Sequence, residues 1–276
     1  MKSIIITSAW LLVTITLQAQ PDESVPVKPL KQQIGLGIGF QQRQLLDEQK
    51  SALVYASAEY SAGLFYRKAN DRSVFSLDLN FSTGNYFAKH FRNRQIYTVG
   101  YNIDGTATTD SVPVFSGILA GVFEVSYLRR IGSQATINWY IGPAIKDMLV
   151  YPENNIGLLN SLGLYLTVQA AGNINAKNRL SARIAIPLAA INSRLPWHNT
   201  ATSPVWSETR TFFSKGTRLV TTNNFQSVQF NLNYTFRFAS RWNLGADYTF
   251  IWLRIPYYQP MKSISNNFQL QTSYRF

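Results

Sequence analysis

The chain has 276 residues, contains no cysteine and carries a formal net charge of +12. The lack of cysteine excludes a disulfide framework. The basic residues are spread over expected turns and loops and form no stripe, which argues against nucleic-acid binding. Aromatic residues make up 14% of the chain, and after the N-terminal region no apolar run has the roughly 18 residues of a membrane-spanning helix.

Residues 1–19 have the pattern of a cleavable export signal. The start is basic at Lys2, an apolar run extends from Ile4 to Leu17, and the small residue Ala19 follows. This run is too short for a spanning helix and suits a secretory signal peptide. We therefore expect export and removal of this segment.

Residues 20–31 are rich in proline, which is poorly tolerated inside a strand. We expect this segment to be a periplasmic lead-in. From residue 32 onward the chain alternates between large apolar residues and small or polar ones. In the first such segment Ile34, Leu36 and Ile38 share one face, and glycines occupy the other.

Ten such segments follow one another along the chain. We interpret each as part of a tilted strand, which needs about 9–11 residues to cross a bilayer, because each keeps a period of two rather than the 3.6 of a helix. The segments lie at 34–40, 58–67, 73–81, 119–127, 137–141, 162–169, 180–188, 228–237, 242–250 and 268–276.

The connections between segments alternate in length. Short ones lie near 68–72, 129–134, 172–178 and 239–241, and longer ones near 44–52, 83–113, 146–159, 191–223 and 255–265. Short turns on one side and long loops on the other are typical of outer-membrane barrels. We predict an all-β fold over 32–276, a transmembrane antiparallel up-and-down β-barrel of about ten strands. Eight or twelve strands would require a misread hairpin inside 83–113 or 191–223.

The last segment ends on an aromatic residue. Phe268, Leu270, Thr272, Tyr274 and Phe276 share one face. This ending resembles the C-terminal signal of Gram-negative outer-membrane β-barrel proteins, in which a final Phe or Trp follows an aromatic residue two positions earlier. The resemblance implies a place in the cell outer membrane, contact with outer-membrane lipids and glycolipid, and reading of Leu270, Tyr274 and Phe276 by the barrel-assembly machinery.

Aromatic residues gather at the expected strand ends, as in the interfacial girdles of membrane barrels. A soluble lipocalin-like barrel would instead turn its apolar face inward, and a β-sandwich would have turns of similar length on both sides. The short-turn edge would carry Tyr66, Tyr127, Phe238, Trp242, Tyr274 and Phe276, and the long-loop edge Trp252, Tyr257 and Tyr258.

Charged residues fall on the inward face of several segments. In a barrel this narrow they must pair or stay hydrated. We expect a polar and charged lumen filling and a structural or narrow porin-like transport role. Three of the acids would lie at similar depth, matched by arginines from the opposite wall. The expected network consists of Glu59, Asp78, Glu124, Arg183, Arg237 and Asp247, with Arg67 and Arg275 also inward.

Catalytic candidates are few, and we expect no enzyme. His90 and His198 could pair with Asp104 or Asp110, as acids and a histidine do in the ten-stranded omptin proteases, but no local motif joins them. The segment 198–203 contains His and Ser without a recognisable hydrolase spacing. An outer-membrane protease or lipid hydrolase remains an alternative. No metal or cofactor motif is found in the sequence.

The two longest loops mix cations with aromatics, which could grip glycolipid phosphates or bind a partner as an adhesin does. Alternatively, their aromatics pack on one another in solvated loops. In 83–113 the residues concerned are Phe87, Lys89, His90, Phe91, Arg92 and Arg94. In 191–223 they are Arg194, Trp197, Trp206, Arg210, Phe212, Phe213, Lys215 and Arg218.

Overall fold

The computed structural model of the chain describes residues 32–91, 95–101, 106–113, 115–132, 136–153, 155–195 and 208–276. The expected export signal and periplasmic lead-in lie outside these residues. Among the described residues, no helix has the length and apolar character needed to cross a membrane.

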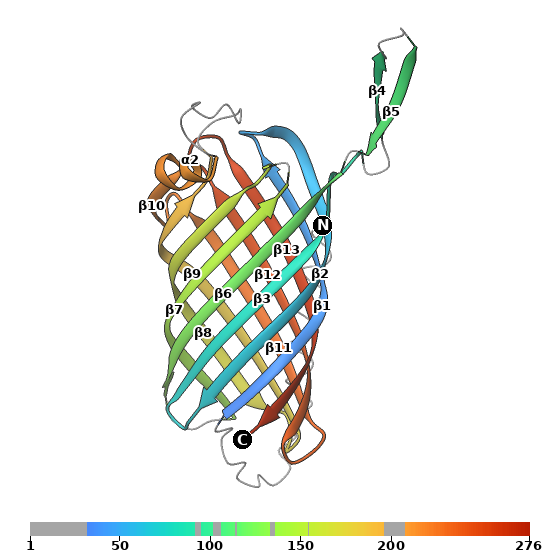
Figure 1. Ribbon diagram of the computed structural model, residues 1–276. Helices are drawn as coiled ribbons and strands as arrows, with labels where there is room; N and C mark the ends of the chain where they lie inside the picture. Colours follow the sequence, from blue (N-terminus) through green and yellow to red (C-terminus); the bar gives the residue numbers. More distant parts are fainter. Residues whose placement is uncertain are drawn as a thin grey trace.

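Ten antiparallel strands form a closed barrel, as the alternating segments predict (Figure 1). The first and last strands, β1 and β13, pair with each other, so the sheet has no open edge along its wall. The barrel strands are β1 (Gln32–Asp47), β2 (Ser51–Ala69), β3 (Ser73–Ala88), β6 (Phe115–Ile131), β7 (Ile137–Pro152), β8 (Leu159–Asn173), β9 (Asn178–Ser193), β11 (Gln226–Arg237), β12 (Trp242–Ile255) and β13 (Met261–Arg275).

The strands are longer than the sequence pattern suggests. β1 has 16 residues and β2 has 19, and only three residues separate them. The long connections expected near 44–52 and 146–159 are therefore wrong, because most of their residues belong to strands. Outward-facing polar residues such as Gln42 and Gln44 stay paired with β2. Backbone pairing continues beyond the point where the apolar alternation ends, since it does not depend on side-chain hydropathy.

Additional elements lie at the end of the barrel opposite the C-terminus (Figure 1). Strands β4 (Gln95–Tyr101) and β5 (Ala107–Pro113) form a separate two-stranded hairpin that projects away from the wall. Helix α2 (Glu208–Lys215) precedes β10 (Thr217–Thr221), which pairs with the end of β9. The expected loop region 83–113 thus contains a hairpin, but this hairpin does not enter the barrel wall.

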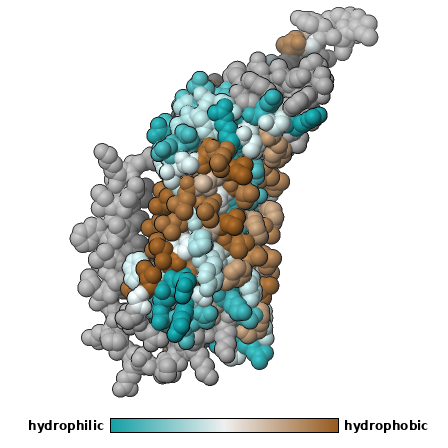
Figure 2. Space-filling view, turned by 90° about the vertical axis from the view of Figure 1, so that its left-hand side faces the viewer, coloured by the Kyte–Doolittle hydropathy of each residue, from teal (hydrophilic) through white to brown (hydrophobic). Residues whose placement is uncertain are grey.

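The outer surface carries an apolar band between two more polar ends (Figure 2). Large apolar side chains of β1 and β13 are exposed there, including Ile38 at 71% and Leu270 at 60%. A band of this kind suits contact with lipid, because soluble proteins rarely expose so much contiguous apolar surface.

Aromatic side chains meet at the short-turn edge near the C-terminus. The rings of Trp242 and Tyr274 lie 5.2 Å apart, and those of Tyr274 and Phe276 lie 6.4 Å apart. Arg241 donates a hydrogen bond of 3.0 Å to the Tyr274 hydroxyl. This cluster matches the expected girdle, since each ring has an apolar body and Tyr and Trp also carry a polar group.

Candidate functional site: the lumen

Every barrel strand sends alternate side chains into the lumen, so the lumen is the place where distant parts of the chain meet. Three levels follow one another along the barrel axis. An apolar layer lies toward the long loops, a set of charge clusters occupies the middle, and an arginine-lined cavity lies at the short-turn end.

The apolar layer is formed by inward-facing side chains from most of the strands. Leu45, Ile118, Phe225 and Ile255 are each at most 3% exposed. The expectation of a lumen filled by polar and charged residues is wrong at this level. Most of the inward positions here lie beyond the segments recognised by alternation, so the sequence pattern missed them. The buried cluster comprises Leu45, Tyr86, Ile118, Ala120, Ala144, Met148, Val150, Leu159, Tyr165, Ala185, Ala190, Val220, Phe225, Leu253, Ile255 and Met261.

Above this layer, Arg194 and Asp47 form a buried ion pair in which each side chain is at most 3% exposed. Arg194 also donates hydrogen bonds to the carbonyl oxygens of Tyr257 and Gln259, at 3.2 and 2.7 Å. The second carboxylate oxygen of Asp47 accepts from the backbone N–H of Gly157 at 3.0 Å. Arg194 was expected among the rim cations. It is instead buried, and it connects the end of β1 to the loop between β12 and β13.

Glu59 lies in a compact cluster below the apolar layer. Arg43 Nε lies 3.1 Å from Glu59 Oε1, and the hydroxyls of Ser57 and Ser82 also donate to this carboxylate. Arg43 is inward because β1 keeps its alternation past residue 40, a continuation that the sequence reading did not follow. The partner of Glu59 thus comes from the neighbouring strand and not from the opposite wall.

Asp78 and Glu124 face each other directly on β3 and β6. Arg183 reaches Glu124 from β9, and Arg67 Nη2 lies 3.8 Å from Asp78 Oδ1. Glu59 instead faces Gly84, several residues further along β3. The expectation of three acids at similar depth is therefore wrong for Glu59. Of Glu59, Asp78 and Glu124, only Glu124 forms an ion pair with an arginine from a non-adjacent strand.

Lys146 is a further cation at this level that the sequence reading missed. It faces Glu124 on the adjacent strand, is 2% exposed, and donates to the side-chain oxygen of Gln229. Because β7 was expected to end near residue 141, Lys146 was placed in a loop. Its burial beside Glu124 gives that carboxylate a second cationic neighbour.

The Asp247 carboxylate accepts hydrogen bonds from neutral side chains. The side-chain nitrogens of Asn231 and Asn233 donate to it at 2.9 and 3.0 Å, and Thr249 donates at 3.2 Å. Arg237 lies apart from the acids, at the short-turn end of β11, and its Nε has no hydrogen-bond partner among the described residues. The expected single network therefore divides into separate clusters, and Arg237 belongs to none of them.

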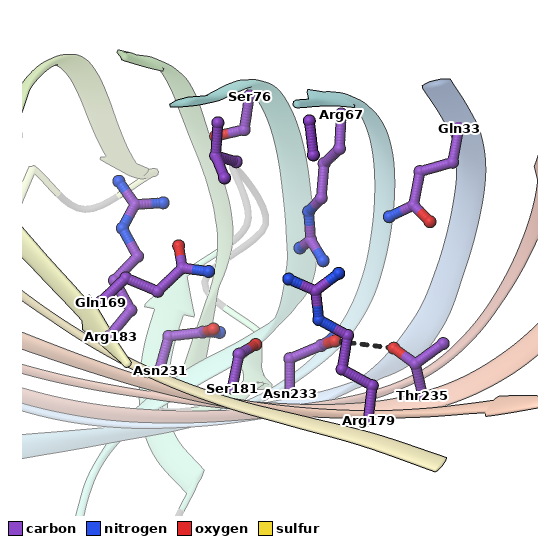
Figure 3. A pocket seen from close by; sticks show the side chains of 12 residues that line it. Gln33, Arg67, Ser76, Gln169, Arg179, Ser181, Arg183, Asn231, Asn233 and Thr235 are labelled. Carbon is purple, nitrogen blue, oxygen red and sulfur yellow. Dashed lines mark hydrogen bonds between the residues drawn. The ribbon is translucent and has the colours of Figure 1, made fainter. Parts of the chain in front are cut away.

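The cavity at the short-turn end has a volume of about 60 Å³. The guanidinium groups of Arg67 and Arg179 point toward one another across it (Figure 3). Amide and hydroxyl side chains complete its wall. The lining residues are Gln33, Arg67, Ala69, Val74, Ser76, Gln169, Arg179, Ser181, Arg183, Asn231, Asn233 and Thr235.

The catalytic candidates are not brought together by the described part of the chain. His90 lies in the turn after β3, whereas Asp110 belongs to β5 of the projecting hairpin. His198 and Asp104 lie outside the described residues. Within the described ranges, no group of three His, Cys, Asp or Glu side chains could hold a metal ion.

At the long-loop rim, aromatic residues partly pack on one another. Phe212 is buried and its ring lies 4.9 Å from that of Phe213. The Arg218 guanidinium lies 4.4 Å from the ring centre of Tyr258 and 5.8 Å from that of Tyr257. Burial at this rim raises the pKa of the Tyr257 hydroxyl above its ordinary value.

Comparisons with known proteins give no match to a family model and none to a curated protein. Among solved structures, the chain is similar to the outer membrane protease OmpT from Escherichia coli, with 7% identity and a TM-score of 0.49 over 92% of this chain and 99% of that one. The transport unit of the autotransporter AIDA-I from Escherichia coli has 9% identity and a TM-score of 0.43, over 96% and 97% of the two chains. The translocator domain of autotransporter NalP from Neisseria meningitidis has 9% identity and a TM-score of 0.38, over 100% and 97%. At these values the similarities carry no information on role.

The class of the protein follows from its own geometry. An even number of antiparallel strands closes without an edge, exposed apolar side chains occur on strands all around the wall, and aromatic residues border them at the short-turn end. Since closure satisfies every backbone group of the wall without help from water, such a sheet can cross a bilayer. The chain has the architecture of a Gram-negative outer-membrane β-barrel.

Proposed function

We propose that this protein is an integral barrel of the cell outer membrane, exported through residues 1–19, whose closed lumen makes it a rigid scaffold and not an end-to-end pore. The observation that carries this proposal is the apolar layer below the buried pair of Arg194 and Asp47. An ion passing this level would lose much of its hydration against buried apolar side chains.

The burial of individual side chains supports this argument. Leu159 and Ile255 are 0% exposed, and Phe225 and Met261 are 1% exposed. A water-filled path beside them would leave their inner surfaces accessible. The narrow porin-like role would require such a path from one end of the lumen to the other, so the closed scaffold is the better-supported reading.

Planar-bilayer recording tests the proposal. The purified, folded barrel is expected to give no unitary conductance at moderate voltage. A triple variant Leu45→Ala/Phe225→Ala/Leu253→Ala, which removes bulk from the apolar layer, should produce small conductance steps. Heat-modifiable gel migration verifies that both proteins are folded. Regular unitary steps from the unmodified barrel would refute the closed lumen.

We propose as a second candidate role that the outer rim binds anionic glycolipid. Arg254 and Lys262 are exposed and paired with each other across β12 and β13, near the long-loop end. Two adjacent cations repel each other, and an anion between them would remove this repulsion. At the long-loop end, Arg254 and Lys262 would lie at the level of the outer-leaflet phosphates. This geometry supports glycolipid as a partner, with no catalytic role required.

Copurification measures this second role. Phosphate bound per barrel after extraction in mild detergent should fall in Arg254→Gln/Lys262→Gln. The matched control is Arg72→Gln/Arg241→Gln, which removes two cations from turns at the opposite end. Equal phosphate content in the rim variant and the unmodified protein would exclude glycolipid binding at this site.

A further inference from the structure

The cavity at the short-turn end of the lumen carries more positive charge than the scaffold role requires. Arg67 has a distant acid partner, Asp78, and Arg183 is paired with Glu124. Arg179 has neither an ion pair nor a hydrogen bond of its guanidinium among the described residues. Its guanidinium instead points toward that of Arg67 (Figure 3).

Two guanidinium groups facing each other inside a narrow barrel repel, because solvent screening there is weaker than in bulk water. An anion between them would remove this repulsion and accept hydrogen bonds from both. Arg183 also lines the cavity, but it is paired with Glu124 and its guanidinium points away from those of Arg67 and Arg179 (Figure 3). The arrangement is that of a prepared anion site rather than a completed ion-pair network.

The composition of the wall indicates the kind of anion. The guanidinium groups of arginine suit planar or tetrahedral oxyanions, and the side-chain amides of Gln33 and Gln169 offer further N–H donors. A volume of about 60 Å³ is enough for several water-sized groups and too small for a large solute. Two facing guanidinium groups around a small space favour a doubly charged tetrahedral oxyanion over a singly charged carboxylate.

The approach to the cavity is also basic. Arg237 and Arg275 lie on the last inward positions of β11 and β13, and each has a buried guanidinium nitrogen without a hydrogen-bond partner among the described residues. A narrow mouth lined by one sign of charge raises the local concentration of the opposite charge. An anion entering from the short-turn side would therefore be drawn toward Arg67 and Arg179.

We propose that the short-turn end of the lumen binds phosphate, free or as the terminal group of a phosphate ester, between Arg67 and Arg179. This inference goes beyond the closed-scaffold role and is independent of it, because the cavity lies on the other side of the apolar layer.

Isothermal titration of the folded barrel in zwitterionic detergent tests the proposal. Inorganic phosphate is titrated first, and glucose 1-phosphate and acetate are titrated in parallel at constant ionic strength. Saturable binding of phosphate, with acetate at least about tenfold weaker, is expected from the charge and donor count. Binding of glucose 1-phosphate would identify an ester as a ligand, and its failure to bind would restrict the site to free phosphate.

The decisive variant is Arg179→Gln, which removes the unpaired guanidinium without opening the lumen. It should weaken phosphate binding by about tenfold or more. Arg72→Gln, in the exposed turn between β2 and β3, removes the same charge at the same end and should leave binding unchanged. Arg179→Lys should restore part of the affinity, since it keeps the charge and loses the fork.

Three results would overturn the site: no saturable phosphate binding by the folded barrel, equal loss of binding in Arg179→Gln and Arg72→Gln, or acetate binding as tight as phosphate. If Arg179→Gln fails to fold by heat-modifiable migration, Ser181→Leu provides the second variant. This substitution fills the cavity from the same strand and should abolish phosphate binding, and unchanged binding would also overturn the proposal.

Discussion

Arg194 and Asp47 are 147 positions apart in the chain and form a buried ion pair at the long-loop end of the lumen. The pair joins the residue that follows β9 to the last residue of β1. Further bonds from the same two side chains reach Gly157 and the backbone between β12 and β13. One pair thus holds together loops from widely separated parts of the barrel.

Arg194→Leu should lower the free energy of unfolding by about 3–5 kcal/mol, because it leaves the Asp47 carboxylate buried without its cation. Urea titration of the barrel in lipid vesicles, followed by tryptophan fluorescence, measures the loss. The exposed Arg218 provides the control, since Arg218→Leu should change the stability by about 1 kcal/mol or less. A similar small effect of both substitutions would show that the buried pair contributes little.

Gly157→Ala should destabilise the loop between β7 and β8 for two reasons. The residue has a φ of +82°, and an added Cβ would lie 2.6 Å from Leu45 Cδ1. Gly132 has the same φ but no atom within 4 Å of such a Cβ, so Gly132→Ala reports backbone strain alone. We expect about 1 kcal/mol for Gly132→Ala and about 1–3 kcal/mol more for Gly157→Ala. Equal losses in urea titrations would show that the loop yields to the added methyl group.

Glu124→Gln should cost more stability than Asp78→Asn, although the two acids face each other. Glu124 has both Arg183 and Lys146 as cationic neighbours and is 4% exposed. Its neutralisation would leave these cations buried, at about 3 kcal/mol. Asp78 is more exposed and its contact with Arg67 is 3.8 Å long, so about 1 kcal/mol is expected. The reverse order in parallel urea titrations would contradict the assigned pairings.

Phe276→Ser should block insertion into the outer membrane while leaving export intact. The residue is 58% exposed, its ring stacks with Tyr274, and it follows the strand that closes the barrel. Cell fractionation and heat-modifiable migration measure the two steps. Phe213→Ser, which removes an aromatic ring that is 53% exposed at the opposite end, should assemble normally. Equal assembly of both variants would remove the terminal residue from the assembly signal.

The strand count could be predicted from the sequence because lipid imposes a period of two on every wall segment. Ile34 to Phe40 and Phe268 to Phe276 show this period directly, and the structure pairs them with each other. The same reasoning failed where polar residues interrupt the outward apolar series. On β1 the outward positions after Phe40 are Gln42 and Gln44, so Arg43 was missed as a lumen residue. On β7 the outward Asp147 interrupts an otherwise apolar outer face, so Lys146 was missed as well.

Local alternation and connection length were enough to predict the barrel, its closure and the end on which the short turns lie. The filling of the lumen could not be predicted in this way. Inward side chains from different strands meet there at distances set by strand register and tilt. The sequence of a single strand predicts neither the register nor the tilt. The apolar layer, the pair of Arg194 with Asp47 and the facing guanidiniums of Arg67 and Arg179 all arise from such meetings.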